Sequence, residues 1–372
     1  MRIAVIGAGI VGVHIAVALA RSGAEVTMLD RGEPGGGTTA GSFAWIDASH
    51  PGIAPYLELR VLGVDAWHRI DEEYGRPRWL SLTGTLIWTR APEEAEKLER
   101  HFRRLEAHGG SPRRLSVREA LGREPDLRLP SDVEAVYGLD GEGWVQTGPA
   151  IAALLQRGHA DGLRLRAATE VRELSVASSG RLVGLVLASG ERVRTDAVVS
   201  CVGRFTDSLL GPAGIHVPML KTGAAEVPVA GLVARTSSTP CRIGSVLLAD
   251  GMLIRSDNGG RLLVHSDACD ARLTGQTPGP GAGEQLLELL ARRLRGAEQT
   301  KVEYTRVCVR AIPRDLVPVA GWALDGLYVV ATHSGVTLAP GLADLVAAEV
   351  LDGANREELA RFRPGRFGKV MV

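Results

Sequence analysis

The sequence predicts an α/β protein with two domains: a Rossmann-type dinucleotide-binding domain, split along the chain, and an inserted domain of mixed antiparallel β-sheet and helices. Three observations predict this fold. A glycine-rich turn follows the first apolar run, apolar runs typical of buried strands return at residues 197–202 and 326–331, and residues 213–307 show alternating strand patterns. A chain of 372 residues also exceeds one ordinary core and suits about two domains.

Composition and charge exclude several classes of protein. Apolar residues make up 45% of the chain and charged residues 23%, which is typical of a globular protein in water. Basic and acidic residues balance at 43 each, so we expect no bulk attraction to nucleic acid or to an anionic membrane. No apolar run reaches the roughly 18 residues that a membrane span needs. The excess of arginine, alanine and glycine favours a bacterial source.

The cysteines indicate a reducing compartment. The chain has four of them, far apart and without a CxxC pair: Cys201, Cys241, Cys269 and Cys308. We therefore expect no metal site and no disulfide framework, and we predict a cytoplasmic location. The apolar start of the chain is interpreted as mature structure and not as a signal peptide, because its glycines fall at the positions of a nucleotide-binding turn.

The first thirty residues predict a strand, a turn, a helix and a second strand. Residues 2–6 are a short apolar run ended by glycine, as in a buried parallel strand. Residues 10–21 have helical spacing, and Gly23 just past them is a stop signal. The second strand is expected at residues 25–30.

Later elements follow from the same patterns. Helices are predicted at 57–74, 93–108, 148–158, 284–295 and about 340–351, strands at 197–202 and 326–331, and hairpin turns at 178–180 and 189–190. This order assigns residues 1–75, 146–212 and 308–372 to the dinucleotide-binding domain, and residues 76–145 and 213–307 to a substrate domain.

The glycine-rich turn predicts a site for the ADP half of a dinucleotide. Gly7, Gly9 and Gly12 satisfy GxGxxG between a strand and a helix. Gly7 allows the tight turn, Gly9 lets the backbone approach the pyrophosphate, and Gly12 lets helix and strand pack closely. Asp30 ends the second strand, where a carboxylate can accept hydrogen bonds from a ribose. A βαβ turn that binds nothing would not explain Asp30.

Two further segments favour FAD over NAD. The loop at residues 35–42 offers backbone amides and small hydroxyls that can line an extended cofactor, although a flexible surface loop has the same composition. The late strand and helix in YVVATHSGVTLAPGLADLV supply a second helix N-terminus, which can stabilise negative charge on a reduced flavin. A nicotinamide-dependent dehydrogenase needs no such element and stays as an alternative.

With these motifs placed, the chain resembles the D-amino-acid oxidase family of flavoenzymes, which includes glycine oxidase and monomeric sarcosine oxidase. The resemblance covers almost the whole length. It rests on the order and spacing of GAGIVG, GTTAGS, GEGWVQTGP, AVVSCVGRFTDSLL, VRAIPRDLVPVAG, THSGVTLAP and RFRPGRF. It implies an FAD-binding domain of the glutathione-reductase-like type, split in sequence.

The resemblance also implies a reaction. An amine or amino acid would lose hydride from the carbon next to nitrogen to flavin N5, the imine would hydrolyse, and oxygen or another acceptor would take the electrons. The alternative is an FAD-binding subunit of a multi-subunit amine or amino-acid dehydrogenase. Expected partners are a small-molecule substrate and an electron acceptor. A second copy of the chain is a further candidate partner, and nucleic acid is not expected.

Arg310 is the leading candidate for substrate binding. In RAIPRDLVPVAG it occupies the place of the family's carboxylate-binding arginine, and a guanidinium can hold a carboxylate with two parallel hydrogen bonds. His333 could adjoin the flavin, and Trp45 with His50 could form an aromatic wall near it, although capping and packing roles are equally plausible for these residues. Arg255 could be a second anion contact.

The remaining predicted site residues are contacts to the cofactor. They are Gly7, Gly9, Ile10, Val11, Gly12, Asp30, Arg31, Thr38, Thr39, Ser42, Val171, Gly203, Cys308, His333, Ser334, Gly335, Val336, Thr337 and Leu338. Cys308 lies near the place where some family members attach FAD covalently, and the alternative is a buried, inert cysteine. The Thr332–Ala339 segment is interpreted as a loop by the flavin, shorter than in many family members.

Overall fold

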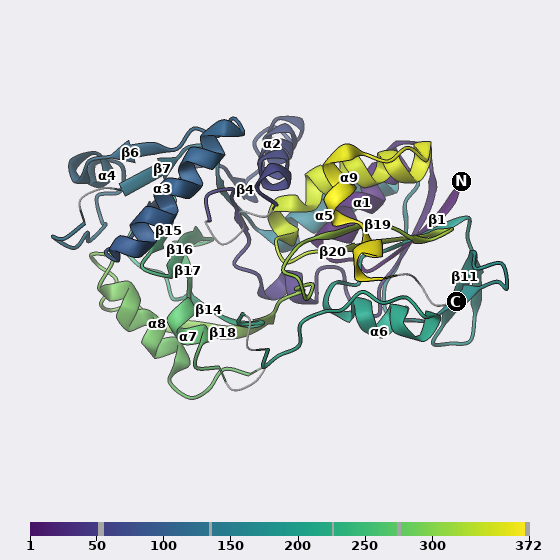
Figure 1. Ribbon diagram of the computed structural model, residues 1–372. Helices are drawn as coiled ribbons and strands as arrows, with labels where there is room; N and C mark the ends of the chain where they lie inside the picture. The colour runs from purple at the N-terminus through teal and green to yellow at the C-terminus, as the bar shows by residue number, and fades with distance from the viewer. Residues whose placement is uncertain (51–55, 134–135, 225–226, 274–276, 369–372) are drawn as a thin grey trace. The chain divides into compact units, whose positions relative to one another are not determined.

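The computed structural model describes residues 1–50, 56–133, 136–224, 227–273 and 277–368 (Figure 1). The chain divides into two compact units. The first unit comprises Met1–Ala40, Gln146–Lys221 and Arg310–Val372, and the second comprises Gly41–Val145 and Thr222–Val309.

These units differ from the expected boundaries mainly at residues 41–75, which group with the second unit. Strand β3 (Trp45–Ile46) pairs with β8 (Gly143–Val145) of that unit. The first unit also extends to Lys221, because the Leu220 N–H donates to the Ile312 carbonyl at 2.8 Å. The composition of residues 35–42 signals a loop, but it does not reveal which sheet the following strand joins.

A six-stranded sheet forms the centre of the first unit. Its order is β19 (Val319–Leu324), β20 (Leu327–Ala331), β13 (Ala197–Ser200), β1 (Arg2–Ile6), β2 (Glu25–Leu29) and β9 (Arg164–Arg166). Every pairing is parallel except β19 with β20. The parallel strands are continuous apolar runs because both faces of such a sheet are covered.

Three helices of the first unit pack together. Helix α1 (Ile10–Arg21) contacts α5 (Thr147–Ala160) and α9 (Gly335–Asp352), as Figure 1 shows. The short elements of this unit are the 3₁₀ turns η1 (Thr38–Gly41, ending at the unit boundary), η3 (Gly203–Phe205), η4 (Gly211–Ala213), η5 (Glu357–Phe362) and η6 (Pro364–Phe367) and helix α6 (Thr206–Leu210). A small antiparallel sheet of β10 (Val171–Val176), β11 (Leu182–Leu187) and β12 (Arg192–Arg194) completes it, with both predicted hairpin turns confirmed.

The second unit contains an eight-stranded mixed sheet. Its order is β18 (Val302–Val309), β14 (Ala230–Thr236), β17 (Arg261–Ser266), β16 (Met252–Asp257), β15 (Val246–Ala249), β5 (Thr85–Trp88), β7 (Val136–Leu139) and β6 (Arg113–Leu115). Only β15 with β5 is parallel among these described pairings. A second small sheet joins β3, β8 and β4 (Leu80–Ser81).

Helices supply the rest of the second unit. They are α2 (Leu57–Glu73), α3 (Pro92–Ala107), α4 (Val117–Arg123), α7 (Asp267–Asp270) and α8 (Ala282–Ala291). Leu98, Phe102 and Leu105 of α3 follow the helical repeat and are all buried, so one stripe of this charged helix faces the core. Leu286 and Leu290 of α8 are fully buried in the main core of the unit.

Most predicted elements are confirmed within two residues, and three differ. The strand expected at 197–202 ends at Ser200, because the chain then turns toward Gly203, whose φ is +56°. Helix α8 stops four residues before the expected end at 295, because Leu294 forms an isolated β-bridge with Leu127. Helix α9 begins at Gly335 instead of near Pro340. A proline is most often a helix start, which explains the prediction, but here Pro340 lies inside the helix.

No helix among the described residues is long and apolar enough to span a bilayer.

Candidate functional site

The turn after β1 requires two of its three glycines for packing. A Cβ on Gly7 would lie 2.6 Å from the Cys201 carbonyl oxygen, and the φ of Gly7 is +99°. A Cβ on Gly12 would lie 1.9 Å from the Gly7 carbonyl oxygen. Both residues are therefore fixed by the close approach of α1 to β1 and β13.

Gly9 differs because the protein itself does not exclude a side chain there. Its backbone has an ordinary φ of −70°, and a Cβ would meet only the Thr39 hydroxyl oxygen, at 3.3 Å. A glycine that neither the turn nor the packing demands indicates that a ligand approaches this backbone. The turn therefore fits the pyrophosphate of a dinucleotide.

The N-terminus of α1 is free to bind an anion. Gly9 supplies no side-chain cap, and the first turn carries no acidic residue. The Thr39 hydroxyl accepts from the Ile10 N–H at 3.1 Å, while the N–H groups of Val11 and Gly12 have no acceptor within the helix. Their N–H groups and the helix dipole favour a phosphate at this end.

Asp30 fixes the turn from the end of β2. One carboxylate oxygen accepts from the Ala8 N–H at 2.6 Å and the other from the Gly32 N–H at 2.8 Å. A carboxylate has about four lone-pair positions, so it can hold these two amides and still accept from a ribose. Arg31 beside it stacks on Phe205, with the guanidinium carbon 3.9 Å from the ring centre.

The N-terminus of α9 lies beside that of α1. A Cβ on Gly335 would be 3.2 Å from a methyl carbon of Val11. The first turn of α9 has no acidic residue, and Ser334 at its start makes no side-chain cap. Two helix N-termini thus meet at the carboxyl ends of β1 and β20, where open α/β sheets bind their ligands.

Comparison with known proteins decides the family. The profile of the DAO family, described as FAD dependent oxidoreductase, matches residues 2–349. The chain belongs to this family. It is therefore an oxidoreductase with FAD as its cofactor, and the predicted family, fold class and cofactor are confirmed.

Relatives of this oxidoreductase differ in their printed activities. A D-amino acid dehydrogenase of a Methylobacterium species is 30% identical over 59% of the chain and 64% of that relative. A component of the opine oxidase of Rhizobium meliloti is 25% identical over 98% of the chain and 96% of its own. The crystal structure of a glycine oxidase from Geobacillus kaustophilus has a TM-score of 0.83 at 23% identity and covers 98% of the chain and 99% of its own.

The Thr332–Ala339 segment corrects the prediction of a loop. Only its first three residues precede the helix, and Val336, Thr337 and Leu338 are buried side chains of the first turns of α9. These residues can therefore reach a cofactor mainly through backbone N–H groups. His333 is exposed just before the helix.

The other predicted cofactor residues lie in varied surroundings. Thr38 begins η1, and Gly203 begins η3 with its Cβ position 3.6 Å from the Ala311 side chain. Val171 belongs to the apolar core of the first unit. The Ser42 hydroxyl, in the second unit, accepts from the Ala44 N–H at 3.0 Å and closes a local turn.

The candidate substrate residues divide between the units. The structure brings Trp45 and His50 together in the second unit, as an edge-to-face pair with ring centres 6.1 Å apart. The Trp45 indole N–H donates to the Thr85 hydroxyl at 3.1 Å. Cys308 is buried in the same unit, with its Cβ 3.2 Å from the Cβ position of Gly41. Arg310 is half-buried and begins the last segment of the first unit.

A buried carboxylate network behind Trp45 is absent from the sequence prediction. Glu142 accepts from the Ala48 N–H and from the Ser49 hydroxyl, both at 2.8 Å. Burial, and next the charge of Asp47, raise the pKa of Glu142 to about 7. Asp47 is itself buried and paired with Arg60. The motif GEGWVQTGP contains Glu142, but no local pattern shows that its side chain reaches residues 48 and 49.

Proposed function

We propose that this oxidoreductase oxidises an amino acid or a related amine at the carbon bonded to nitrogen. One observation carries the proposal for this chain. Ala311 packs beside Gly203 at the carboxyl end of β13, so the backbone of the adjacent Arg310 lies by the crevice where the two helix N-termini meet. A crevice at the carboxyl ends of parallel strands is where such sheets bind their ligands.

Arg310 would hold the substrate carboxylate with two parallel hydrogen bonds and so orient the reacting C–H bond. Bound FAD supplies the acceptor for the two electrons and the hydrogen that leave this carbon. The substrate nitrogen gives its electron pair to the new C=N bond, and water then hydrolyses the imine. A substrate that binds as a neutral amine needs no general base among the protein residues.

A second proposal keeps this chemistry but changes the electron acceptor. The similarity to an opine oxidase subunit along nearly the whole chain supports a role as the FAD-binding subunit of a larger dehydrogenase. In that case a partner protein, and not oxygen, would take the electrons.

Anaerobic titration of the FAD-loaded protein with amino acids tests the proposal. A suitable substrate is expected to bleach the yellow flavin absorption. Reoxidation by air would then indicate an oxidase, and reoxidation only by an artificial dye acceptor would indicate a dehydrogenase subunit. Failure of every amino acid and amine to reduce the flavin would contradict the proposal.

Two variants test the role of Arg310. Arg310→Ala is expected to raise KM for amino acids by about 100-fold, because two charge-assisted hydrogen bonds are lost, and to change KM for plain amines much less. The control is Arg314→Ala, an exposed arginine in the same segment. Equal effects of the two substitutions on amino-acid KM would refute the role of Arg310.

A further inference from the structure

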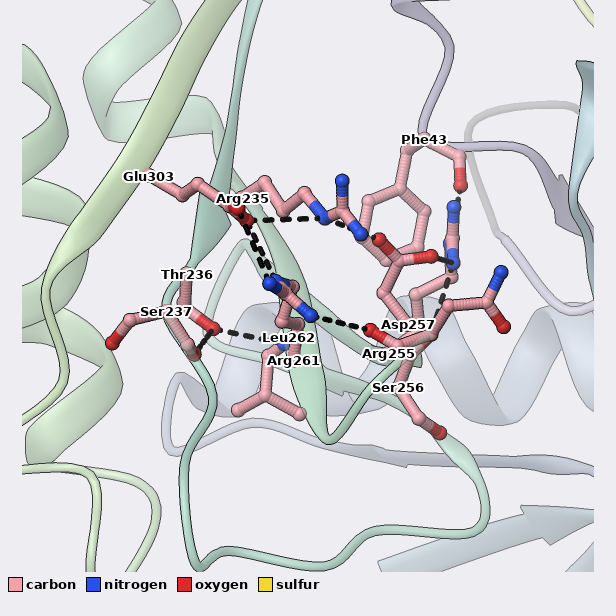
Figure 2. A network of polar contacts seen from close by, with 11 residues as sticks. Phe43, Arg235, Thr236, Ser237, Arg255, Ser256, Asp257, Arg261, Leu262 and Glu303 are labelled. Atoms are coloured by element: carbon pink, nitrogen blue, oxygen red, sulfur yellow. Dashed lines mark hydrogen bonds and ion pairs between the residues drawn. The ribbon is translucent and has the colours of Figure 1, made fainter.

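Arg255 of strand β16 is a buried arginine packed against aromatic rings of the second unit. Only 5% of it is exposed, and its guanidinium carbon lies 4.5 Å from the ring centre of Trp144 and 5.6 Å from that of Phe43. Its Nε donates to the Phe43 carbonyl at 2.8 Å and its Nη1 to the Ser256 carbonyl at 2.9 Å (Figure 2). Two of its three nitrogens are therefore occupied by the protein.

Two hydrogen-bond donors at this place have no acceptor. The Arg255 Nη2 makes no hydrogen bond within the described part of the chain. The indole Nε1 of Trp144 is buried and likewise has no partner among the described residues. Because the Trp144 ring lies on the guanidinium, both donors are in the same neighbourhood. Buried donors are rarely left unpaired, so the pair indicates an acceptor supplied by a ligand.

The charge of the surrounding network identifies the acceptor as an anion. In Figure 2 three cations face two carboxylates: Arg235, Arg255 and Arg261 against Asp257 and Glu303. The shortest ion pairs, both at 2.8 Å, join Arg235 to Asp257 and Arg261 to Glu303, whereas Arg255 lies 3.6 Å from Asp257. Burial lowers the pKa of Arg255 to about 10, which leaves it cationic at neutral pH. One positive charge of the network is thus left for a ligand.

We infer that Arg255 Nη2 and Trp144 Nε1 together bind a carboxylate of the substrate. This inference rests on the proposed function, which assigns another carboxylate to Arg310. A substrate with two carboxylates, an acidic amino acid or an N-carboxyalkyl amino acid, has one for each arginine. Phe43, Leu253 and Leu263 belong to the same apolar cluster as Trp144 and suit the carbon chain that bears the carboxylate.

A purely structural role for the stacked pair makes a different prediction. If Arg255 and Trp144 only hold β16 to the segment at Phe43, the indole N–H contributes nothing, because it has no partner among the residues that the structure describes. Trp144→Phe keeps an aromatic ring on the guanidinium and removes only that N–H and part of the ring. The substitution therefore separates binding from packing.

Calorimetric titration of the FAD-loaded protein with glutarate, which cannot be oxidised at a C–N bond, measures the site without turnover. We expect Trp144→Phe to raise the Kd for glutarate about 10-fold and Arg255→Lys about 100-fold, since bonds to charged groups are the strong ones. Butyrate, with one carboxylate, should bind more weakly than glutarate to the wild type and lose less in both variants. KM for dicarboxylic substrates should rise in parallel, with kcat changed less.

Controls and contrary outcomes are defined by the same titration. Arg261→Gln removes an arginine already paired with Glu303, and Trp322→Phe alters a tryptophan of the first unit, so both should leave the Kd for glutarate unchanged. An unchanged Kd in Trp144→Phe would overturn the inference, as would tighter binding of chloride or inorganic phosphate than of glutarate. Weakened glutarate binding in a protein whose flavin no amine reduces would refute the proposed function and leave the carboxylate site intact.

Discussion

Single glycines separate what the fold requires from what the cofactor requires. Gly9→Ala adds a Cβ whose nearest protein atom is the Thr39 hydroxyl, at 3.3 Å, so we expect the apoprotein to fold with nearly unchanged Tm. The same Cβ would occupy the backbone approach used by the pyrophosphate, so FAD retention should fall at least about 10-fold. The ratio of flavin to protein absorbance after gel filtration measures this loss.

Gly12→Ala is the matched comparison. Its Cβ would lie 1.9 Å from the Gly7 carbonyl, so this variant should fail to fold or melt far below the wild type. If both substitutions spare FAD binding, the glycine turn is not the pyrophosphate site.

Glu142 makes the stability of the second unit depend on pH. Because burial and Asp47 raise its folded pKa to about 7, the folded state holds the proton more tightly than the unfolded chain does, with its ordinary carboxyl pKa near 4.5. The free energy of unfolding should therefore fall as pH rises from about 5 to 7, by roughly 3 kcal/mol in all, and then level off.

Glu142→Gln removes this titration and keeps an oxygen that can accept from the Ala48 N–H. The variant should gain stability over the wild type between pH 5 and 8, measured by urea unfolding across that range. The exposed Glu93→Gln serves as a control, and parallel pH profiles for wild type and Glu142→Gln would contradict the raised pKa.

At the scale of elements, α9 is joined to the C-terminal turns by one buried ion pair. The Glu349 carboxylate is 1% exposed and accepts from both Nη atoms of Arg363, at 2.5 and 2.6 Å, and from the Tyr328 hydroxyl at 2.7 Å. Burial acts to raise the pKa of Glu349, but these hydrogen bonds outweigh it and leave the pKa below its usual value.

Arg363→Met should cost about 3–5 kcal/mol in the free energy of unfolding, because it leaves a buried carboxylate without its cation. Urea unfolding at neutral pH measures the loss. Arg361→Met, at an exposed position nearby, should cost little. Adding Glu349→Gln to Arg363→Met should recover part of the loss, and a double variant no better than the single one would show that the charge is not the cause.

Local patterns predict elements well and their pairing poorly. The helices at Ile10–Arg21 and Leu57–Glu73 are evident from apolar spacing, because that spacing is set within a few turns. Strand Trp45–Ile46 is only two residues long, and its partner Trp144 is distant in sequence. Such a pairing depends on the whole fold, so the assignment of residues 41–75 could not be made from their own sequence.

The same reasoning explains the candidate sites at the scale of the whole molecule. Gly7, Gly9, Gly12 and Asp30 act within one βαβ unit, so their spacing alone predicts them. Trp144 acquires its proposed role from a different cause. Its importance depends on lacking a partner among the described residues, and an unpaired N–H is visible only once the surrounding residues are placed.

A cofactor domain built from three distant pieces of chain should respond to FAD as one body. Since FAD binds the folded state, it stabilises that state by about 2.7 kcal/mol at a concentration 100 times its Kd. Hydrogen exchange should therefore slow on FAD addition in residues 1–40, 146–221 and 310–368 together, most strongly at the N–H groups of Val11 and Gly335, where the two helix N-termini meet. Gly9→Ala, treated in the same way, should show no such protection. Protection limited to the N-terminal piece would mean that the later pieces do not contribute to the cofactor site, and the split-domain assignment would then be wrong.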